Sequence, residues 1–414
     1  MRIMAASLEA VDPYTAVQKF LPRLEGRVYG LAIGKAALPM MDALAAQIPL
    51  AGGLAVTKFA PPDARGGYRI MEGGHPVPDA RSLQAGERAL EFVASLKGDD
   101  TLVCLISGGG SALVTAPYVP LKDLQVLTSM LLASGAPIDE INTLRRQLDR
   151  VKGGGLARAT RAKIISLILS DVIGNPLEAI ASGPTAPDPT TKEQALQILE
   201  KYAEMLTTEA RKHGDPFGSV SLWLRGSNGS PDLNQDDSVF ARVEYIIIGD
   251  NQLAARAALE QAEREGFHAE ILTSELQGEA RDRGRELARR LRVDSTVRPR
   301  PFCLIAGGET TVTIQGNGRG GRNQELALAA VQELAGMHDV LLISLATDGD
   351  DGPTDAAGAV VTGETARRAE VLGLDAAHHL SRNDAYPFFE ALGDLLKTGP
   401  TATNVNDLIF LFAF

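Results

Sequence analysis

The chain has 414 residues, of which 44% are hydrophobic and 22% are charged, and its formal net charge is −11. This length is too great for one ordinary domain and suits two, while the apolar content excludes a disordered chain. The negative charge and the lack of a sustained basic stripe argue against a nucleic-acid partner. No apolar run is long enough to cross a bilayer, so no membrane partner is expected.

The first twenty residues, MRIMAASLEAVDPYTAVQKF, carry acidic side chains and lack the uninterrupted apolar stretch of a signal peptide. The two cysteines, Cys104 and Cys303, lie inside apolar runs and show neither disulfide nor metal-site spacing. Both features predict a cytoplasmic protein with buried, reduced thiols.

Short apolar runs alternate along the chain with stretches of helical period, which is typical of a mostly parallel sheet covered by helices. The runs are continuously apolar, as expected of strands buried on both faces. The predicted strands cover residues 28–33, 101–106, 164–169, 243–248, 302–306 and 340–346. The predicted helices cover residues 36–47, 82–96, 252–265, 278–291 and 323–334.

The segment 213–238 is rich in Gly, Ser, Asp and Pro and is the predicted boundary between two α/β domains. We expect an N-terminal domain of residues 1–225 and a somewhat smaller C-terminal domain of residues 226–414. The run NVNDLIFLFAF at 404–414 predicts a further strand, which the sequence assigns to neither sheet.

Polar or glycine-rich residues follow each predicted strand directly. Ligands of open parallel sheets bind beyond the carboxyl ends of the strands, so these strand exits are candidate site segments. They are Gly34-Lys35, residues 107–111, Ser170-Asp171, and residues 249–251, 307–309 and 347–351.

The exit after the strand at 101–106 has the sequence SGGGSA. Glycines let the backbone approach an anion closely, and the N–H groups at a helix start point toward it. We therefore predict a phosphate- or substrate-binding turn, whereas a tight turn without a ligand is the alternative. The predicted binding residues are Ser107, Gly108, Gly109, Gly110 and Ser111.

Two lysines, Lys35 and Lys152, are candidates for binding an anion. Lys35 lies at a predicted helix start, where the helix dipole disfavours a cation, which suggests an anionic ligand nearby. The segment is not a Walker A loop, because the glycine spacing and the following Ser or Thr are missing. Lys152 lies among arginines just before Gly153–Gly155, where a solvated basic face is the alternative.

The segment ATDGDDGPTDAAG holds the densest acidic cluster, after the strand at 340–346. Mg²⁺ prefers one or two carboxylates together with phosphate oxygens, so we predict Asp348 and Asp351 as metal ligands. An aspartate turn without a metal is the alternative. Asp171 is a second carboxylate, suited to a metal or to accepting a hydroxyl proton.

The segment GNGRGGRNQ contains the spacing G-x-G-x-x-G at Gly316, Gly318 and Gly321, which by itself favours a dinucleotide-binding site. The preceding run TTVTI, however, alternates like an exposed strand. Arginines at 319 and 322 occupy the turn, where a dinucleotide site needs only backbone. An NAD-dependent oxidoreductase is therefore the weaker alternative.

Together these segments resemble the glycerate 2-kinase family. The resemblance extends over nearly the whole chain, through the motifs at 73–82, 105–117, 141–157, 169–191, 307–328, 346–359 and 401–408. It implies a Rossmann-like N-terminal domain, a MOFRL-type C-terminal domain and an active site in the cleft between them. One departure is the arginine-rich Arg145-Arg146-Gln147, which leaves a specific role for Arg146 open.

The resemblance also implies the reaction, which is phosphorylation of D-glycerate at its 2-hydroxyl with ATP and a divalent metal, Mg²⁺. Some members carried the name hydroxypyruvate reductase, so that activity is the alternative. The expected partners are these small molecules, and a homo-oligomer is possible. Which loop binds ATP and which binds glycerate stays open.

Phosphoryl transfer depends on positioning and on neutralising charge. We predict that Lys35 and Arg322 neutralise the charge of the transferred group, and that Asp171 is the general base. The remaining predicted contacts to substrate or phosphate are His75, Lys152, Glu309, Arg319 and Asn323.

Overall fold

The structure is a computed structural model of the chain that describes residues 1–60, 67–213, 216–226 and 237–414. Its internal contacts divide the chain into two compact units. The parallel-sheet unit contains Val17–Leu169 and Asn175–Ile248. The mixed-sheet unit contains Met1–Ala16, Ser170–Gly174 and Gly249–Phe414.

This division differs from the boundary predicted between residues 225 and 226. β6 (Val243–Gly249), which we expected in the C-terminal domain, is an edge strand of the first sheet. α1 (Arg2–Ala10) belongs to the mixed-sheet unit although it opens the chain. Composition locates loops but not which strands pair or which helices pack together, which accounts for both differences. Much of the predicted boundary segment, at 214–215 and 227–236, lies outside the described residues.

The first sheet has six strands in the order β3-β2-β1-β4-β5-β6, which is the doubly wound order of a Rossmann-like fold. Its strands are β1 (Val28–Ile33), β2 (Gly52–Thr57), β3 (Arg69–Glu72), β4 (Thr101–Ile106), β5 (Lys163–Leu169) and β6. The pairs β1–β2, β1–β4, β2–β3 and β4–β5 are parallel. The strand order reverses between β1 and β4, so the predicted Rossmann-like sheet is confirmed.

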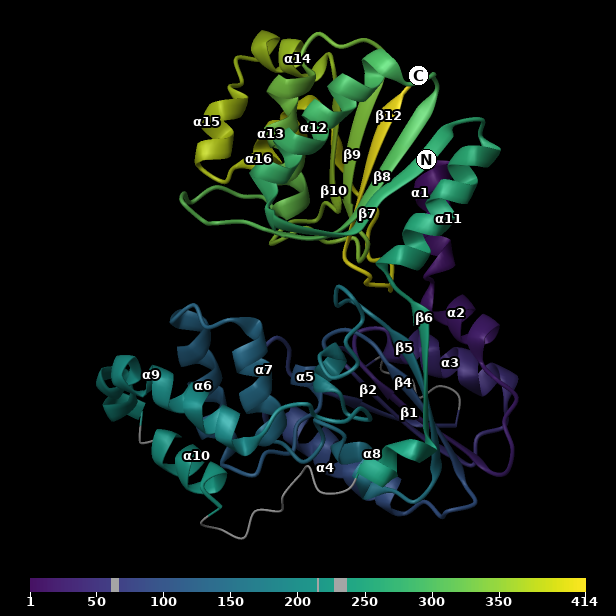
Figure 1. Cartoon of the computed structure of the whole chain (residues 1–414), viewed down its shortest axis with the longest axis vertical. Helices are drawn as coiled ribbons and strands as arrows, with labels where there is room; N and C mark the ends of the chain where they lie inside the picture. Colours follow the sequence, from purple (N-terminus) through teal and green to yellow (C-terminus); the bar gives the residue numbers. More distant parts are fainter. Residues whose placement is uncertain (61–66, 214–215, 227–236) are drawn as a thin grey trace. The chain divides into compact units, whose positions relative to one another are not determined.

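Helices cover this sheet, and four of them form a cluster of their own (Figure 1). The cluster packs around Trp223, whose ring stacks on Tyr118 at 4.0 Å between ring centroids. The helices of the unit are the second half of α2 (Pro13–Phe20), α3 (Ala37–Gln47), α4 (Ala80–Ala94), α5 (Gly110–Leu113), α6 (Leu121–Ala133), α7 (Ile138–Gln147), α8 (Gly155–Ala159), α9 (Lys192–His213), α10 (Pro216–Leu224) and the short 3-10 turns Ile180–Ser182 and Asp237–Arg242. The cluster consists of α6, α7, α9 and α10.

The second sheet is mixed, with the strand order β11-β10-β9-β12-β8-β7. Its strands are β7 (His268–Glu279), β8 (Phe302–Thr311), β9 (Val340–Ala346), β10 (Gly358–Thr362), β11 (Leu395–Leu396) and β12 (Asp407–Ala413). β12 lies between β8 and β9 and runs antiparallel to both, so the final strand belongs to this sheet. All seven of its residues are buried, as a central strand requires.

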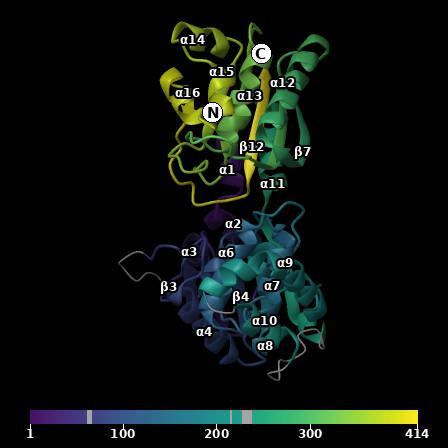
Figure 2. The same ribbon diagram turned by 90° about the vertical axis from the view of Figure 1, so that its left-hand side faces the viewer.

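The side chains of β12 alternate between two apolar layers. Ile409 and Leu411 join the core formed with α12 (Ala280–Val297) and α13 (Arg322–Leu334). Phe412 faces the N-terminal residues instead, on the side where α1 packs against α11 (Asn251–Arg264) (Figures 1 and 2). The smaller helices α14 (Thr365–Val371), α15 (Ala376–Ser381) and α16 (Ala385–Leu392) complete the unit.

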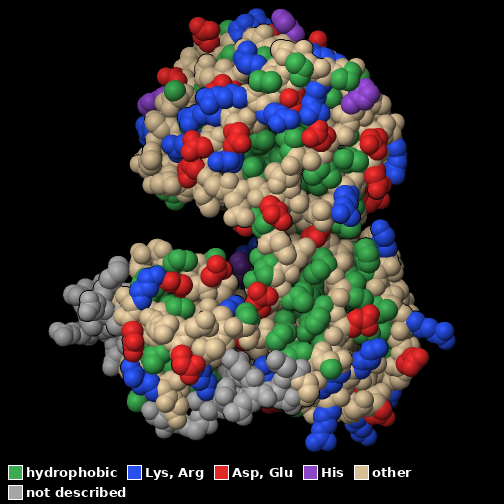
Figure 3. Space-filling view, in the orientation of Figure 1, with side chains coloured by type: hydrophobic (Ala, Val, Ile, Leu, Met, Phe, Trp, Pro, Cys, Tyr) green, Lys and Arg blue, Asp and Glu red, His purple; other side chains and the backbone are tan. Residues whose placement is uncertain are grey.

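Several surface and burial predictions can be compared with the structure. Cys104 in β4 and Cys303 in β8 are buried, and burial raises the pKa of both thiols to about 12. Within the described ranges, no helix is both long and apolar enough to span a membrane. On the face seen in Figure 3, basic and acidic side chains of the described residues are interspersed rather than gathered by sign.

Candidate active site

Two predicted site segments meet at the point where the strand order of the parallel sheet reverses. Lys35 follows β1 and the turn at 107–111 follows β4, and the backbone N–H of Lys35 donates to the carbonyl of Gly108 at 2.9 Å. A ligand of a doubly wound sheet binds outside the strand ends at this reversal. The structure therefore brings the predicted lysine and the predicted glycine turn together where such sheets usually bind their ligands.

His75 joins this pair through Gly109. Gly109 has a φ of +82°, and a Cβ added there would lie 3.2 Å from both Lys35 Cγ and His75 Cδ2. Only glycine suits this left-handed backbone without strain, and only glycine leaves room for both neighbours. Lys35 is exposed, and no hydrogen bond or ion pair joins its ammonium to another residue in the described part of the chain.

The His75 ring is held neutral by its surroundings. Burial, and to smaller extents the positive charges of Lys35 and Lys58, lower its pKa to about 4. At neutral pH the ring therefore offers one N–H donor and one acceptor without adding positive charge. Lys58 follows β2 and is a cation of this region that the sequence analysis did not select.

The two serines of the turn have different surroundings. Ser107 is buried, and its hydroxyl accepts the N–H of Ala36 at 3.1 Å and donates to the carbonyl of Ile33 at 3.4 Å, so it fixes the exit of β1. The Ser111 hydroxyl lies 2.8 Å from that of Ser182. Ser182 and the preceding Ala181 both have left-handed backbone, with φ of 61° and 50°.

This left-handed segment packs on the glycine turn and marks a place that single motifs did not reveal. Non-glycine residues in this conformation cost of order 1 kcal/mol or more each and concentrate at functional sites. The carbonyl of Ser182 accepts the N–H of Gly153 at 3.0 Å, and that of Gly183 accepts the N–H of Gly154 at 2.7 Å. Three loops from separate parts of the sequence are thereby joined.

Lys152, predicted as a phosphate ligand, directs its ammonium into the protein. Its Nζ lies 2.5 Å from Asp149 Oδ2 and 3.3 Å from Thr115 Oγ1, and both charged side chains are almost fully buried. Burial lowers the pKa of Lys152, while Asp149 acts in the opposite direction. These contacts are those of an interior ion pair.

Two arginines near Lys152, Arg145 and Arg146, differ in their contacts. Arg146 is buried and pairs with Asp188 at 2.8 Å, which is a structural contact. Arg145, in the last turn of α7, is substantially desolvated, and this lowers its pKa. Its guanidinium has no hydrogen bond or ion pair to any residue that the structure describes, so it is a further candidate for holding an anion.

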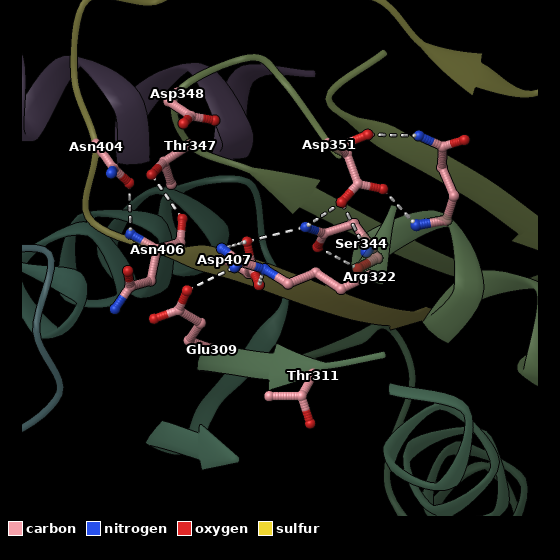
Figure 4. Close-up of polar contacts among 12 residues, drawn as sticks. Glu309, Thr311, Arg322, Ser344, Thr347, Asp348, Asp351, Asn404, Asn406 and Asp407 are labelled. Atoms are coloured by element: carbon pink, nitrogen blue, oxygen red, sulfur yellow. Dashed lines mark hydrogen bonds and ion pairs between the residues drawn. The ribbon is translucent and has the colours of Figure 1, made fainter. Parts of the chain in front are cut away.

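The mixed-sheet unit builds its polar cluster around Arg322, at the start of α13 (Figure 4). Its Nε donates to Asp407 Oδ2 at 2.7 Å and its Nη2 to Asp407 Oδ1 at 3.1 Å. Its Nη1 donates to Glu309 Oε1 at 2.5 Å. Although burial opposes it, these carboxylates raise the pKa of Arg322.

Asp407, at the first position of β12, is the residue of this cluster that the sequence analysis missed. Burial raises its pKa to about 6, although Arg322 and the Asn323 amide act in the opposite direction. The carboxylate is therefore ionised at neutral pH. Asn323 Nδ2 donates to Asp407 Oδ1 at 2.9 Å, and the Ser344 hydroxyl donates to Asn323 Oδ1 at 2.6 Å. The predicted contact Asn323 is thus an interior link of the network.

Asp351, predicted as a metal ligand, caps the first turn of α13 instead of facing solvent. One oxygen accepts the N–H of Asn323 at 3.0 Å and the other accepts that of Gln324 at 2.8 Å. The side chain is buried, and burial raises its pKa. Helix-start amides are natural partners of a carboxylate, so these contacts account for Asp351 without a metal.

Asp348 has different surroundings from Asp351. It is half-buried, and one oxygen accepts the N–H of Asp350 at 3.2 Å. Within the described ranges, no group of three or more His, Cys, Asp or Glu side chains is arranged to hold a metal.

The predicted general base, Asp171, lies in the mixed-sheet unit although it follows β5. The amide of Asn404 donates to Asp171 Oδ2 at 3.4 Å. Asn404 belongs to the loop that leads into β12, where the Thr347 hydroxyl donates to the carbonyl of Asn406 at 2.6 Å. Asp171 is therefore connected to the loop that carries Asp407.

Arg319, the second arginine of the glycine-rich turn, contacts a different residue from those that bind Arg322. Its guanidinium lies over the ring of Tyr386, 4.0 Å from the centroid. A Cβ at Gly316 would lie 2.4 Å from the carbonyl oxygen of Arg382, and one at Gly318 would lie 2.5 Å from Asp384 Cβ. The glycines of the G-x-G-x-x-G spacing thus admit a neighbouring protein loop, which explains them without a dinucleotide.

Comparisons with known proteins identify two family domains. Residues 1–213 match a domain of unknown function called DUF4147, and residues 302–407 match the MOFRL family. Among curated relatives, a D-glycerate 2-kinase of Thermotoga maritima is 44% identical, over 99% of this chain and 96% of that protein. A glycerate 2-kinase of Pyrococcus horikoshii is 39% identical over 99% and 95%.

One relative has a different name. A protein of Agrobacterium vitis, provisionally named a hydroxypyruvate reductase, is 38% identical over 98% of this chain and 92% of its own length. Among solved structures, the glycerate kinase of Thermotoga maritima superposes with a TM-score of 0.87 at 41% identity, covering 100% of this chain and 98% of that one. From both domains and these full-length likenesses, the chain belongs to the glycerate 2-kinase family with a C-terminal MOFRL domain.

Proposed function

We propose that this protein is a glycerate 2-kinase, which transfers the γ-phosphoryl group of ATP to the 2-hydroxyl of D-glycerate and forms 2-phospho-D-glycerate. The observation that carries the proposal is the likeness to two proteins with this name, over nearly the whole length of both chains. The reaction class is phosphotransfer to an alcohol acceptor, and ATP is a substrate.

The polar group in the parallel-sheet unit suits an anionic substrate. Lys35 is exposed and offers a positive charge, and Gly109, which has no side chain of its own, lies beside Lys35 and His75. The neutral His75 ring offers a donor beside them without raising the local charge further. We assign these three residues to a phosphate or to the glycerate carboxylate, because both present the same anionic oxygens.

The polar group in the mixed-sheet unit suits a group whose negative charge is spread over several oxygens. A transferring phosphoryl group is of this kind, and a guanidinium whose Nε and Nη2 are bound to Asp407 can still donate from Nη1 to one of its oxygens. We assign this role to Arg322. We keep Asp171 as the general base for the 2-hydroxyl, because a carboxylate within hydrogen-bond reach is suited to that proton.

Mg²⁺ is proposed as the metal that accompanies ATP. It requires few protein ligands when phosphates supply the others, and it would neutralise phosphate charge there. Asp348 fits this role, because among the described residues its carboxylate accepts a single hydrogen bond, from the backbone N–H of Asp350. Asp351 fits it less well, since both of its oxygens accept helix-start amides.

A reductase is the second candidate, because one relative is named for hydroxypyruvate reduction. The experiment measures two reactions on the same protein. ADP release with ATP, Mg²⁺ and D-glycerate is followed beside NADH oxidation with hydroxypyruvate. We expect ADP and 2-phosphoglycerate, without NADH turnover. Hydroxypyruvate reduction without ADP release would overturn the proposal and favour the reductase.

A further inference from the structure

The guanidinium of Arg322 has two sides with different partners. On one side, Nε and Nη2 make two parallel hydrogen bonds to Asp407, at 2.7 and 3.1 Å. On the other side, Nη1 contacts Glu309 at 2.5 Å. The Asp407 side chain is only 2% exposed, whereas the Glu309 side chain is 45% exposed. One carboxylate belongs to the interior and the other to the surface.

Asp407 is fixed from several directions. Its Oδ1 also accepts the amide of Asn323, and its backbone carbonyl accepts the amide of Asn251 at 2.9 Å. Its strand is paired on both edges, with β8 and β9. Leaving a buried carboxylate without its cation would be strongly unfavourable, so we expect the ion pair between Asp407 and Arg322 to persist when a substrate binds.

Glu309 is positioned differently. It lies near the end of β8, is exposed like Thr311 two residues later, and contacts Arg322 (Figure 4). Ion pairs of such exposure contribute little, because water solvates both charges well. A phosphate or carboxylate oxygen that reaches the same Nη1 can therefore displace it.

We propose that Asp407 is the positioning residue of Arg322, and that Glu309 occupies the place on Arg322 where an anionic oxygen of a substrate binds. The proposal rests on the proposed function and reassigns Glu309, which we had predicted to contact the substrate. The oxygen belongs to a phosphate of ATP or to the glycerate carboxylate. The two sources share this chemistry, and separate measurements distinguish them.

The first test is Glu309→Gln, which removes the competing charge at an exposed position. We expect the KM of one substrate, ATP or D-glycerate, to fall by about two- to fivefold. The effect is small because the exposed ion pair that is removed contributes little free energy. The substrate that responds identifies the source of the oxygen. Calorimetric titration with ADP and with inorganic phosphate gives a second readout that needs no turnover, and one of these probes or D-glycerate should bind more tightly.

A matched control exists in the same unit. Glu270 pairs with Arg298 at 2.6 Å, and its side chain is also 45% exposed. Glu270→Gln should leave both KM values and all binding constants unchanged. If Glu309→Gln leaves affinities unchanged as well, or weakens the binding of both substrates, the displaceable role of Glu309 is wrong.

The second test is Asp407→Asn, which keeps the size of the side chain but removes its charge. We expect kcat to fall about 10²-fold with a smaller change in KM, because a poorly oriented guanidinium stabilises the transition state less. Combined with Arg322→Lys, the losses should be far from additive, since both changes disable one group.

The control for the loss of a buried carboxylate is Asp294→Asn. Asp294 lies in α12 and pairs with Arg290 and Arg298 at 2.8 and 2.9 Å, with its side chain 7% exposed. This variant should lower Tm and keep kcat. If Asp407→Asn folds and keeps kcat within about threefold of wild type, Asp407 is not a positioning residue. Should the wild type release no ADP, the proposed function fails, whereas the binding titrations of Glu309→Gln still test this inference.

Discussion

At the scale of single residues, the two arginines of the glycine-rich turn have different partners. Arg322 is held by two carboxylates, whereas Arg319 lies over the ring of Tyr386. We predict that Arg322→Lys loses about 10³–10⁵ in turnover, because lysine lacks the planar fork that contacts two oxygens. Arg319→Lys should stay within about threefold of wild type. Steady-state kinetics of both variants measures this, and the reverse order would show that the arginines are misassigned.

The His75 ring allows a prediction of pH dependence. Its pKa should be about 4, compared with 6.5 for a free histidine, because it is buried and lies near Lys35 and Lys58. An NMR titration assigned with His75→Gln measures the midpoint. Lys35→Met should raise this pKa only in part, since burial is the larger cause. A midpoint near 6.5 in the wild type would contradict the environment described for the ring.

The same shift has a consequence for stability. Because the pKa of His75 is lower in the folded state, the unfolded chain binds the proton first as the pH falls. The contribution of His75 to stability is therefore complete above about pH 6.5 and is lost progressively toward pH 4. His75→Gln should lose less unfolding free energy than wild type across this range, as measured by denaturant titration at each pH.

The two aspartates predicted to bind metal should also separate in experiment. Asp348→Asn should increase the Mg²⁺ concentration that half-maximal turnover requires, because it removes a charged ligand. Asp351→Asn should mainly lower Tm, since it weakens the cap on α13. The measurements are Mg²⁺ titrations of activity and thermal unfolding. A raised Mg²⁺ requirement in Asp351→Asn alone would reverse these roles.

Residue types at strand exits made Lys35 and Asp348 predictable as candidates, and the glycine-rich turn before a predicted helix did the same for Arg322, because strands, helices and turns are visible in the sequence pattern. The contacts of those residues were not predictable. Asp407 begins an apolar run and looked like part of a strand, while its partner Arg322 lies 85 positions earlier. Which charged residue faces a ligand and which faces another side chain depends on tertiary packing.

At the scale of elements, the loop at 149–152 is held to the residues that follow α5. Asp149 pairs with Lys152 and accepts the N–H groups of Ala116 and Val151 at 3.2 and 2.8 Å. Removing one member of a buried pair is expected to cost about 3–5 kcal/mol. Both Asp149→Asn and Lys152→Met should therefore lower the unfolding free energy markedly.

The same experiment decides the predicted role of Lys152. If its ammonium serves the interior, Lys152→Met that remains folded should keep KM for both substrates within about twofold. A large rise in KM with little change in Tm would restore Lys152 as a phosphate ligand. Asp188→Asn is a suitable comparison, because Asp188 forms another buried pair in this unit, with Arg146 at 2.8 Å.

The predicted elements were confirmed where the apolar pattern was strong. The strands β1, β4 and β9 have the predicted bounds, and all five predicted helices are present. β7 was missed because much of HAEILTSELQGE is polar, as an edge strand that is partly exposed allows. β2 was missed because it begins with two glycines, which are poor strand formers.

At the scale of the whole molecule, the fold class was predictable but the division of the chain was not. The alternation of strands and helices indicated two α/β domains. The family resemblance identified the first as Rossmann-like and the second as MOFRL-type. The mixed-sheet unit, however, is assembled from three separate parts of the chain, including the short piece Ser170–Gly174. Amino-acid composition does not reveal that these short segments pack with a distant part of the chain, because this depends on which surfaces bury each other in the folded protein.

The position of β12 has a consequence for the order in which the protein becomes functional. Every strand that pairs with β12 precedes it in the sequence, and Arg322 also precedes its partner Asp407. During translation the chain emerges from its N-terminus onward. The parallel sheet can therefore assemble on the ribosome while the mixed sheet still lacks its central strand β12. At that stage Arg322 also lacks its partner Asp407. A chain that stops before Asp407 would therefore leave Arg322 without that carboxylate and would leave the facing edges of β8 and β9 unpaired.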